Sequence, residues 1–454
     1  MTPFRPKADL MRVLVSAALA IALAACGSSA ADPTPPSASP QTGVGSAARP
    51  TFTPVAIALP GATAPATVSV ALTAAPADPA TSPEATAEPT PQSTIQPTGA
   101  PAPPAVPPVK PLRMSSPEYG VQAFMWWRPE VASRDVQAIR DAGFTWVKVG
   151  FGWRDIEGAG KGIYDWSRTD SIVEMANAEN VDLLVRVDHQ PAWTGGSFPL
   201  NGPPANLQDL ADFLGGLAGR YRGRVRAYQV WNEPNLAREW GDQLPDPGAY
   251  VQLLGTAYQA IKAADPNAMV VSAGLSPTGS WSDEARPDDW YLESMYQAMG
   301  GSSQGYLDVL GAHGAGYKSP PEVDPGEVAA NPDLGGHRAF AFRRVEDLRA
   351  IMVQYGDAGK QVALLEFGWT SDPRPESPYH WHAVSEETKA EYLVRAYQFA
   401  KQNWSPWIGV MSLIYMTDPD WTPNDEQYWW AITNPSYPEL SPRPAYTALK
   451  NMPK

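Results

Sequence analysis

Two glutamates of this 454-residue chain follow apolar runs that are typical of buried strands. Glu233 stands in "AYQVWNEPN", between Asn232 and Pro234, and Glu366 stands in "QVALLEFGW". A carboxylate at the end of an apolar strand needs charged or hydrogen-bonding partners, or a shifted pKa, because burying an unpaired charge is costly. Pro234 cannot continue a strand ladder, so it should end the strand and stiffen the turn that presents Glu233.

Two carboxyl groups that face each other can cleave a glycosidic bond. One protonates the leaving oxygen while the other attacks the anomeric carbon, and a separation of about 5 to 5.5 Å gives retention of configuration. Asn232 would then lie beside the acid as a donor to the sugar 2-hydroxyl, a contact that strengthens in the transition state. Glu233 and Glu366 are candidates for such a pair if the fold brings them together.

The elements that must do so alternate between short β-rich runs and amphipathic helical stretches. The expected strands are residues 119–126, 144–153, 181–188, 227–234, 268–276, 306–314, 361–369 and 408–416. The expected helices are residues 133–142, 168–179, 207–221, 247–264, 288–299, 338–355, 386–402 and 443–450. Eight strand–helix units predict an α/β protein with a single closed (β/α)8 TIM barrel, whose catalytic groups lie at the C-terminal strand ends. Glu233 then ends the fourth strand and Glu366 the seventh.

The motif "WNEPN" at the end of the fourth strand, with a glutamate ending the seventh, resembles the clan A glycoside hydrolases, the 4/7 superfamily of retaining (β/α)8 enzymes. The resemblance covers residues 114–453. It implies Glu233 as the general acid/base, Asn232 as the partner of the 2-hydroxyl and Glu366 as the nucleophile, with no cofactor.

The same resemblance implies further residues around the sugar. An aromatic or histidine pair is usual at the end of strand six, for which His313 and Tyr317 are candidates, the tyrosine being able to hydrogen-bond the nucleophile. Arg186 and His189 end the third strand in "VRVDHQPAW" and could line the sugar site. Arg186 could equally serve only to keep Glu366 ionised.

Tryptophans are frequent in the expected loops at the catalytic end, and flat indole faces match the C–H-rich faces of pyranose rings. Trp369 and Trp153 are the sugar platforms that we favour. Clan A enzymes commonly place a tryptophan at the end of strand eight, whereas this strand reads "SLIYMTDPDW". Tyr415 or Trp421 would have to replace it, which leaves the sugar specificity open.

Other interpretations apply to the same residues. Glu233 could be a capped or salt-bridged structural carboxylate, and Glu366 could be a buried partner of Arg186. A metal hydrolase would need histidines clustered at strand ends, but "HWH" at residues 380–382 lies in the expected loop after strand seven, so no metal site is predicted. The alternative function is a catalytically inactive surface lipoprotein that binds glycans with the same barrel.

The first quarter of the chain is typical of an export signal followed by a spacer. Residues 1–25 begin with a basic stretch. They finish with a thirteen-residue apolar run, which is too short for a membrane helix. Cys26, the only cysteine, ends "LAAC", which resembles a bacterial lipoprotein signal with a lipidated cysteine; a secretory peptide with an incidental cysteine is the other interpretation. Residues 26–112 are Pro/Ala/Thr-rich and predict a disordered linker, which leaves residues 113–454 as the catalytic domain.

Charge limits the possible partners of the chain. A formal net charge of −14 argues against nucleic acid or an anionic membrane surface. We expect a β-linked glycan as substrate, membrane attachment only through the lipid, a monomeric state, and a location at the bacterial cell surface or in the periplasm. Neither the polysaccharide nor exo or endo action follows from the sequence, although the insert at residues 318–336 could close one end of a substrate site.

Overall fold

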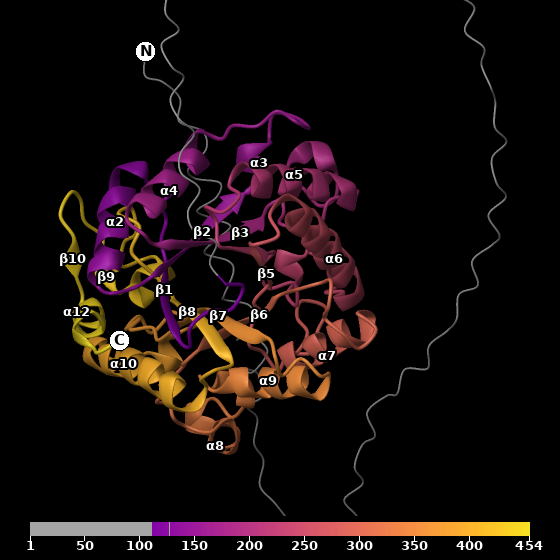
Figure 1. Ribbon diagram of the computed structural model, residues 1–454. Helices are drawn as coiled ribbons and strands as arrows, with labels where there is room; N and C mark the ends of the chain where they lie inside the picture. Colours follow the sequence, from indigo (N-terminus) through magenta and orange to yellow (C-terminus); the bar gives the residue numbers. More distant parts are fainter. Residues whose placement is uncertain (1–110, 127) are drawn as a thin grey trace, which may run out of the picture. The chain divides into compact units, whose positions relative to one another are not determined.

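Figure 1 shows a computed structural model that describes residues 111–126 and 128–454. Eight parallel strands close into a barrel in chain order. They are β1 Glu118–Gln122, β2 Trp146–Gly152, β3 Asp182–Asp188, β4 Ala227–Val230, β5 Met269–Ser272, β6 Val309–Ala315, β7 Gln361–Gly368 and β8 Ile408–Leu413. The predicted α/β class and (β/α)8 TIM barrel are confirmed. The signal peptide, Cys26 and nearly all of the linker lie outside the described residues.

Helices surround the strands as a ring in Figure 1. After each strand in turn come α2 Pro129–Asp141, α4 Ser167–Ala178, α5 Leu207–Arg220, α6 Pro247–Ala264, α7 Asp288–Ala298, α9 Arg344–Gln354, α10 Glu386–Asn403 and α12 Pro444–Asn451. The loops hold α3 Trp153–Ile156, α8 Pro325–Ala330, α11 Glu426–Trp430 and a small antiparallel sheet of β9 Thr433–Asn434 and β10 Ser441–Pro442. Within the described ranges, no helix is long and apolar enough to cross a membrane.

Local sequence signals account for where the helices begin. The carboxylate of Asp246 accepts hydrogen bonds from the backbone N–H groups of Gly248 and Ala249, and Pro247 occupies the first helical position of α6. The helix expected over residues 338–355 begins later than predicted. Residues 338–340 form a separate 3-10 turn, and α9 starts only at residue 344 because Ala341 between them has an extended backbone.

The barrel interior is apolar toward the N-terminal ends of its strands. One buried cluster there consists of Met114, Trp146, Leu184, Ala227, Met269, Val271, Val309, Ala363, Leu365 and Val410. Most of its members come from the first three residues of a strand. This apolar plug leaves the C-terminal ends of the strands as the place where inward-facing polar side chains can gather.

Candidate functional site

A layer of polar side chains lies directly above the apolar plug. Alternate residues of a strand face the same side, so the positions two residues beyond Trp146 and Leu184 also point inward. These positions hold Lys148 and Arg186. In strand β7 an irregularity adds Glu366 to the same layer, because the pairing register with β6 shifts by one residue just before it.

Glu233 is held in a tight turn just beyond the end of β4. Its backbone φ is +39°, a conformation that a non-glycine residue seldom adopts, and the preceding Trp231 has a φ of +73°. The Glu233 N–H donates to the carbonyl of Gly274 at 3.1 Å, and the Glu233 carbonyl accepts from the N–H of Leu236 at 2.9 Å. The turn therefore fixes the direction in which the buried Glu233 side chain leaves the backbone.

Two basic side chains contact the Glu233 carboxyl group. His313 Nδ1 lies 3.0 Å from Glu233 Oε1, and the guanidinium of Arg238 donates to Oε2 at 2.9 Å. Burial raises the pKa of Glu233 and so does the charge of Glu366, but the His313 hydrogen bond and the Arg238 charge outweigh them. The net pKa is lowered. A general acid beside a second carboxylate would have a raised pKa, and the surroundings of Glu233 in the free protein give the opposite direction.

Glu366 is surrounded by a different set of cations. Lys148 Nζ donates to Glu366 Oε1 at 2.7 Å, Arg186 lies 3.9 Å from the same oxygen, and His313 Nδ1 lies 3.8 Å from Oε2. Burial raises the pKa of Glu366, but the charges of Lys148, His313 and Arg186 lower it to about 2. The side chain keeps 17% of its surface exposed. Glu366 is thus an ionised carboxylate that a ligand can reach.

Arg186 is held mainly by Asp188, the carboxylate for which the sequence suggested no role. Arg186 Nε lies 3.1 Å from Asp188 Oδ2, and the other oxygen of Asp188 is 2.6 Å from His189 Nδ1. Burial raises the pKa of Asp188, but the charges of Arg186 and His189 lower it well below its usual range. Arg186 and His189 both remain partly exposed, so this triad can present donors beside Glu366.

Asn232 and Tyr317 lie near Glu233 but have different surroundings. Asn232 is buried, and its side-chain oxygen is 3.4 Å from the Gln229 amide nitrogen. The Tyr317 hydroxyl donates to the carbonyl of Pro277 at 3.4 Å. Among the described residues the structure gives Tyr317 no hydrogen bond to Glu366, so the contact expected with that carboxylate is not formed.

The two tryptophans that we favoured as sugar platforms are fully buried. Trp153 stacks on Phe213 with ring centroids 5.3 Å apart, and its indole N–H donates to Glu157. Trp369 packs against Phe342, and its N–H donates to a backbone carbonyl. Both have 0% of their surface exposed, so the platform expectation is wrong for Trp153 and Trp369.

A different aromatic cluster stands near the end of β8. The rings of Phe124, Tyr415 and Trp421 contact one another, with centroids 4.8 to 5.5 Å apart, and all three are partly exposed. The Ile414–Tyr415 peptide bond is cis. Burial raises the pKa of Tyr415 well above its usual value, and the charge of Glu366 adds to this effect, which places the ring near that carboxylate. Tyr415 and Trp421, the two residues suggested to replace the missing strand-eight tryptophan, are thus both in this cluster.

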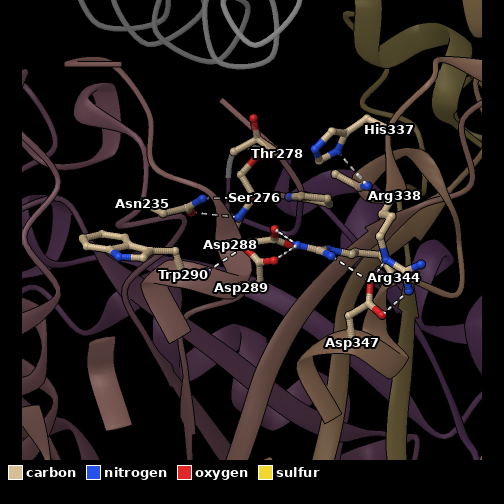
Figure 2. Close-up of polar contacts among 12 residues, drawn as sticks. Asn235, Ser276, Thr278, Asp288, Asp289, Trp290, His337, Arg338, Arg344 and Asp347 are labelled. Atoms are coloured by element: carbon tan, nitrogen blue, oxygen red, sulfur yellow. Dashed lines mark hydrogen bonds and ion pairs between the residues drawn. The ribbon is translucent and has the colours of Figure 1, made fainter. Parts of the chain in front are cut away.

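Polar contacts join loops and helix ends near the C-terminal ends of the strands (Figure 2). Asn235 exchanges hydrogen bonds with the backbone of Ser276, which ties the turn after β4 to the loop after β5. Asp288 at the start of α7 forms a two-point ion pair with Arg344 at the start of α9, at 2.6 and 3.1 Å. Asp347 also accepts from Arg344, at 2.7 Å. These contacts make the support of the site rigid.

Sequence reasoning missed Lys148 and Arg238, the two cations that touch the carboxylates directly. Lys148 could have been found, because a lysine in the apolar run "FTWVKVGFGW" needs a partner if the strand is buried. Arg238 gave no comparable signal, since it follows the strand in an ordinary loop sequence. The contact between Arg238 and Glu233 depends on the loop conformation alone.

Comparison with known proteins agrees with this geometry. Residues 108–299 match the family model described as Cellulase (glycosyl hydrolase family 5). No curated protein matches the sequence. The chain therefore has a (β/α)8 barrel, and one part of it is similar to glycosyl hydrolase family 5. That matched part makes up less than half of the chain.

Solved structures share the fold at low sequence identity. A family 39 glycoside hydrolase from Bacteroides cellulosilyticus WH2 has a TM-score of 0.54 and 19% identity, over 75% of this chain and 63% of that one. A glucosidase from Croceicoccus marinus has a TM-score of 0.52 and 14% identity, over 75% of this chain and 68% of that one. A monomeric β-xylosidase from Caulobacter crescentus CB15 has a TM-score of 0.52 and 18% identity, over 74% of this chain and 69% of that one. The chain thus spans less than two thirds of the first of these proteins.

Proposed function

We propose that the protein is a retaining glycosidase that cleaves β-linked oligosaccharides or polysaccharides by double displacement. In this mechanism Glu366 is the nucleophile and Glu233 is the general acid/base. Neither residue requires a cofactor for these roles. The proposal follows the clan A resemblance of the motif around Glu233, and it is supported by the short distance between the two carboxyl groups, which share a contact with His313.

One observation carries the proposal: a single histidine nitrogen contacts both carboxyl groups. His313 Nδ1 is 3.0 Å from Glu233 Oε1 and 3.8 Å from Glu366 Oε2. The two oxygens therefore cannot be further apart than the sum of these distances, about 6.8 Å. Retaining enzymes hold their carboxyl groups about 5 to 5.5 Å apart, whereas inverting enzymes need about 6.5 to 9.5 Å to admit a water molecule. The limit of about 6.8 Å includes the whole retaining range and excludes all but the lower edge of the inverting range, which supports retention.

The surroundings of Glu366 suit nucleophilic attack, and those of Glu233 suit its ionised form in the second step. Lys148 and Arg186 keep Glu366 ionised, so its oxygen can attack the anomeric carbon and form a glycosyl–enzyme bond. As the glycosyl–enzyme bond forms, the glycosidic bond breaks and Glu233 gives its proton to the leaving oxygen. Glu233, now ionised, then takes a proton from the water that hydrolyses the intermediate, and Arg238 and His313 stabilise this ionised form.

The remaining parts of the proposal concern the substrate and the place of action. Asn232 would contact the sugar 2-hydroxyl, Arg186 and His189 would bind other hydroxyls, and the cluster of Phe124, Tyr415 and Trp421 would replace Trp153 and Trp369 as the apolar platform. We also propose that the protein is a monomer, binds no nucleic acid, and is held at a bacterial membrane by a lipid on Cys26.

The test is hydrolysis by a soluble chain that begins near Arg113. Aryl β-xylosides and β-glucosides are the first substrates, because two similar structures are named as a xylosidase and a glucosidase. Glu366→Ala should abolish turnover. Glu233→Gln should lower it by about 10²- to 10⁴-fold on natural glycans, and much less on aryl glycosides whose leaving groups need no proton. The anomer released first, followed by proton NMR, must be the β-anomer.

If the wild-type chain retains a glycan but cleaves none, the inactive glycan-binding protein becomes the better description. An α-anomer as first product would instead refute the retaining mechanism. A Glu366→Ala variant with full activity would remove Glu366 from the mechanism.

A further inference from the structure

A pocket of about 550 Å³ opens beside the loop that joins β7 to α10. It is lined by Lys318, Ser371, Pro373, His380, Trp381, Ala383, Val384, Ser385 and Glu386. None of these residues takes part in the proposed reaction. The pocket includes two sequence features that the reaction leaves unused, the "HWH" motif and the start of the insert after strand six. Its volume lies within the range of about 300 to 1,000 Å³ that is common for ligand sites.

Trp381 connects this pocket to the catalytic end of the barrel. Its ring is stacked with that of Tyr317, with centroids 6.1 Å apart and an angle of 23° between the planes. Tyr317 lies two residues beyond the end of β6, the strand whose His313 contacts Glu233 at 3.0 Å. The indole also lines the pocket and keeps part of its surface exposed. A glycan that extends from the catalytic carboxylates past Tyr317 would therefore reach this pocket.

The rim of the pocket carries free hydrogen-bond donors. Lys318 and His380 are both exposed, and within the described ranges their side chains make no hydrogen bond or ion pair. An ammonium group and an imidazole can both donate to sugar hydroxyls. An aromatic ring with polar groups around it is the arrangement that suits a pyranose, whose apolar face needs a flat surface and whose edges need hydrogen bonds.

Glu386 does not make the pocket strongly acidic. Its Oε1 atom is 2.9 Å from Lys389 Nζ and 3.2 Å from Arg443, and it also accepts from the Ser371 hydroxyl at 2.5 Å. Two cations thus compensate one carboxylate. The charge of the one carboxylate that lines the pocket is thus compensated at Oε1, while its Oε2 atom is buried without a hydrogen-bond partner.

We propose that this pocket is an accessory subsite that binds one sugar ring of the glycan whose cleaved bond lies between Glu233 and Glu366. The ring stacks on Trp381, and its hydroxyls accept hydrogen bonds from Lys318 and His380. The subsite rests on the proposed glycosidase function and adds a requirement to it. Substrates must be chains long enough to reach the pocket, so the preferred substrate class is a polysaccharide or long oligosaccharide.

The experiment uses the full chain with Lys318→Ala and His380→Ala combined, and Lys401→Ala as the matched control. Lys401 is an exposed lysine near the end of α10 that does not line the pocket. Two readouts are needed: retardation in affinity gels containing soluble xylan or β-glucan, and KM for the same polysaccharide and for an aryl β-glycoside.

In the double variant we expect the dissociation constant and KM for the polysaccharide to rise about five- to tenfold, as befits the loss of two hydrogen bonds. The kinetics with the aryl glycoside should not change, because that substrate does not reach the pocket. The control should match the wild type in both assays.

The outcomes separate the two proposals. If the wild type hydrolyses glycans but the double variant equals it on polysaccharide in both assays, the subsite is refuted and the glycosidase stands. If the wild type binds polysaccharide without cleaving it and the double variant binds more weakly, the subsite stands and the glycosidase fails. If the wild type neither binds nor cleaves any of these polysaccharides, the subsite is refuted as well.

Discussion

Replacing Lys148 with methionine should convert Glu366 into a weaker nucleophile at acidic pH. The two side chains have similar length, but methionine removes both the charge and the hydrogen bond that Lys148 Nζ makes to Glu366 Oε1 at 2.7 Å. The pKa of Glu366 stands at about 2, below its usual 4.5, because the charges of Lys148, His313 and Arg186 overcome burial. Lys148 makes the largest contribution of the three.

The size of the effect can be bounded from these contacts. The net lowering is about 2.5 pH units, and the combined lowering by the three cations is larger because burial raises the pKa. Lys148 must supply more than a third of that larger amount, so its loss should raise the pKa by about one unit or more. This equals about 1.4 kcal/mol of stabilisation of the ionised carboxylate. An upper limit is the Coulomb energy of a pair at 2.7 Å, about 6 kcal/mol at an effective dielectric constant of 20.

The assay is the pH dependence of kcat/KM for an aryl glycoside, supported by carbon-13 NMR titration of the carboxyl groups with Glu366→Gln to assign the signal. We expect the acidic limb and the NMR midpoint to move up by at least about one pH unit in Lys148→Met. Lys262→Met is the matched control. Lys262 Nζ lies 3.0 Å from Asp308 Oδ2, and this ion pair takes no part in the proposed reaction. An unmoved midpoint in Lys148→Met, or an equal movement in the control, would refute the reasoning.

Three further predictions test other parts of the structure. Arg238→Met removes the cation 2.9 Å from Glu233, so the pKa of Glu233 should rise and the alkaline limb of kcat/KM should move to higher pH; a limb that stays in place would contradict the role of Arg238. Trp153→Ala should lower the free energy of unfolding in urea by about 3 to 5 kcal/mol and leave KM for an aryl glycoside unchanged, whereas a stable variant with a raised KM would return Trp153 to the sugar site. Arg344→Met leaves Asp288 buried without its partner and should cost about 3 to 5 kcal/mol in thermal unfolding, of which the double variant with Asp288→Leu should recover most.

The sequence by itself determined the barrel and the strand ends at which its candidate carboxyl groups lie. Alternation of apolar runs with amphipathic stretches is a local property, and each of the eight expected strands overlaps an observed one. Once the units number eight, the closed parallel barrel follows, and Glu233 and Glu366 must lie at the same end of it. The boundaries of the elements were shifted: β4 ends at Val230, before the expected Glu233, and an extended Ala341 interrupts the helix expected at α9.

Only the tertiary structure decided which groups surround those carboxyl groups. The register shift in β7 turns Glu366 toward Lys148. The loop after β4 turns Arg238 toward Glu233. Neither side-chain direction can be predicted from the residue types alone. The direction of the Glu233 pKa shift depends on such contacts, because the His313 hydrogen bond and the Arg238 charge together lower that pKa. Exposure is likewise a property of the packed structure, because an indole ring is equally suited to a sugar or to a core. Trp153 is buried at 0% exposure while Trp381 remains partly open to a pocket, and that difference arises from which helices and loops pack over each ring.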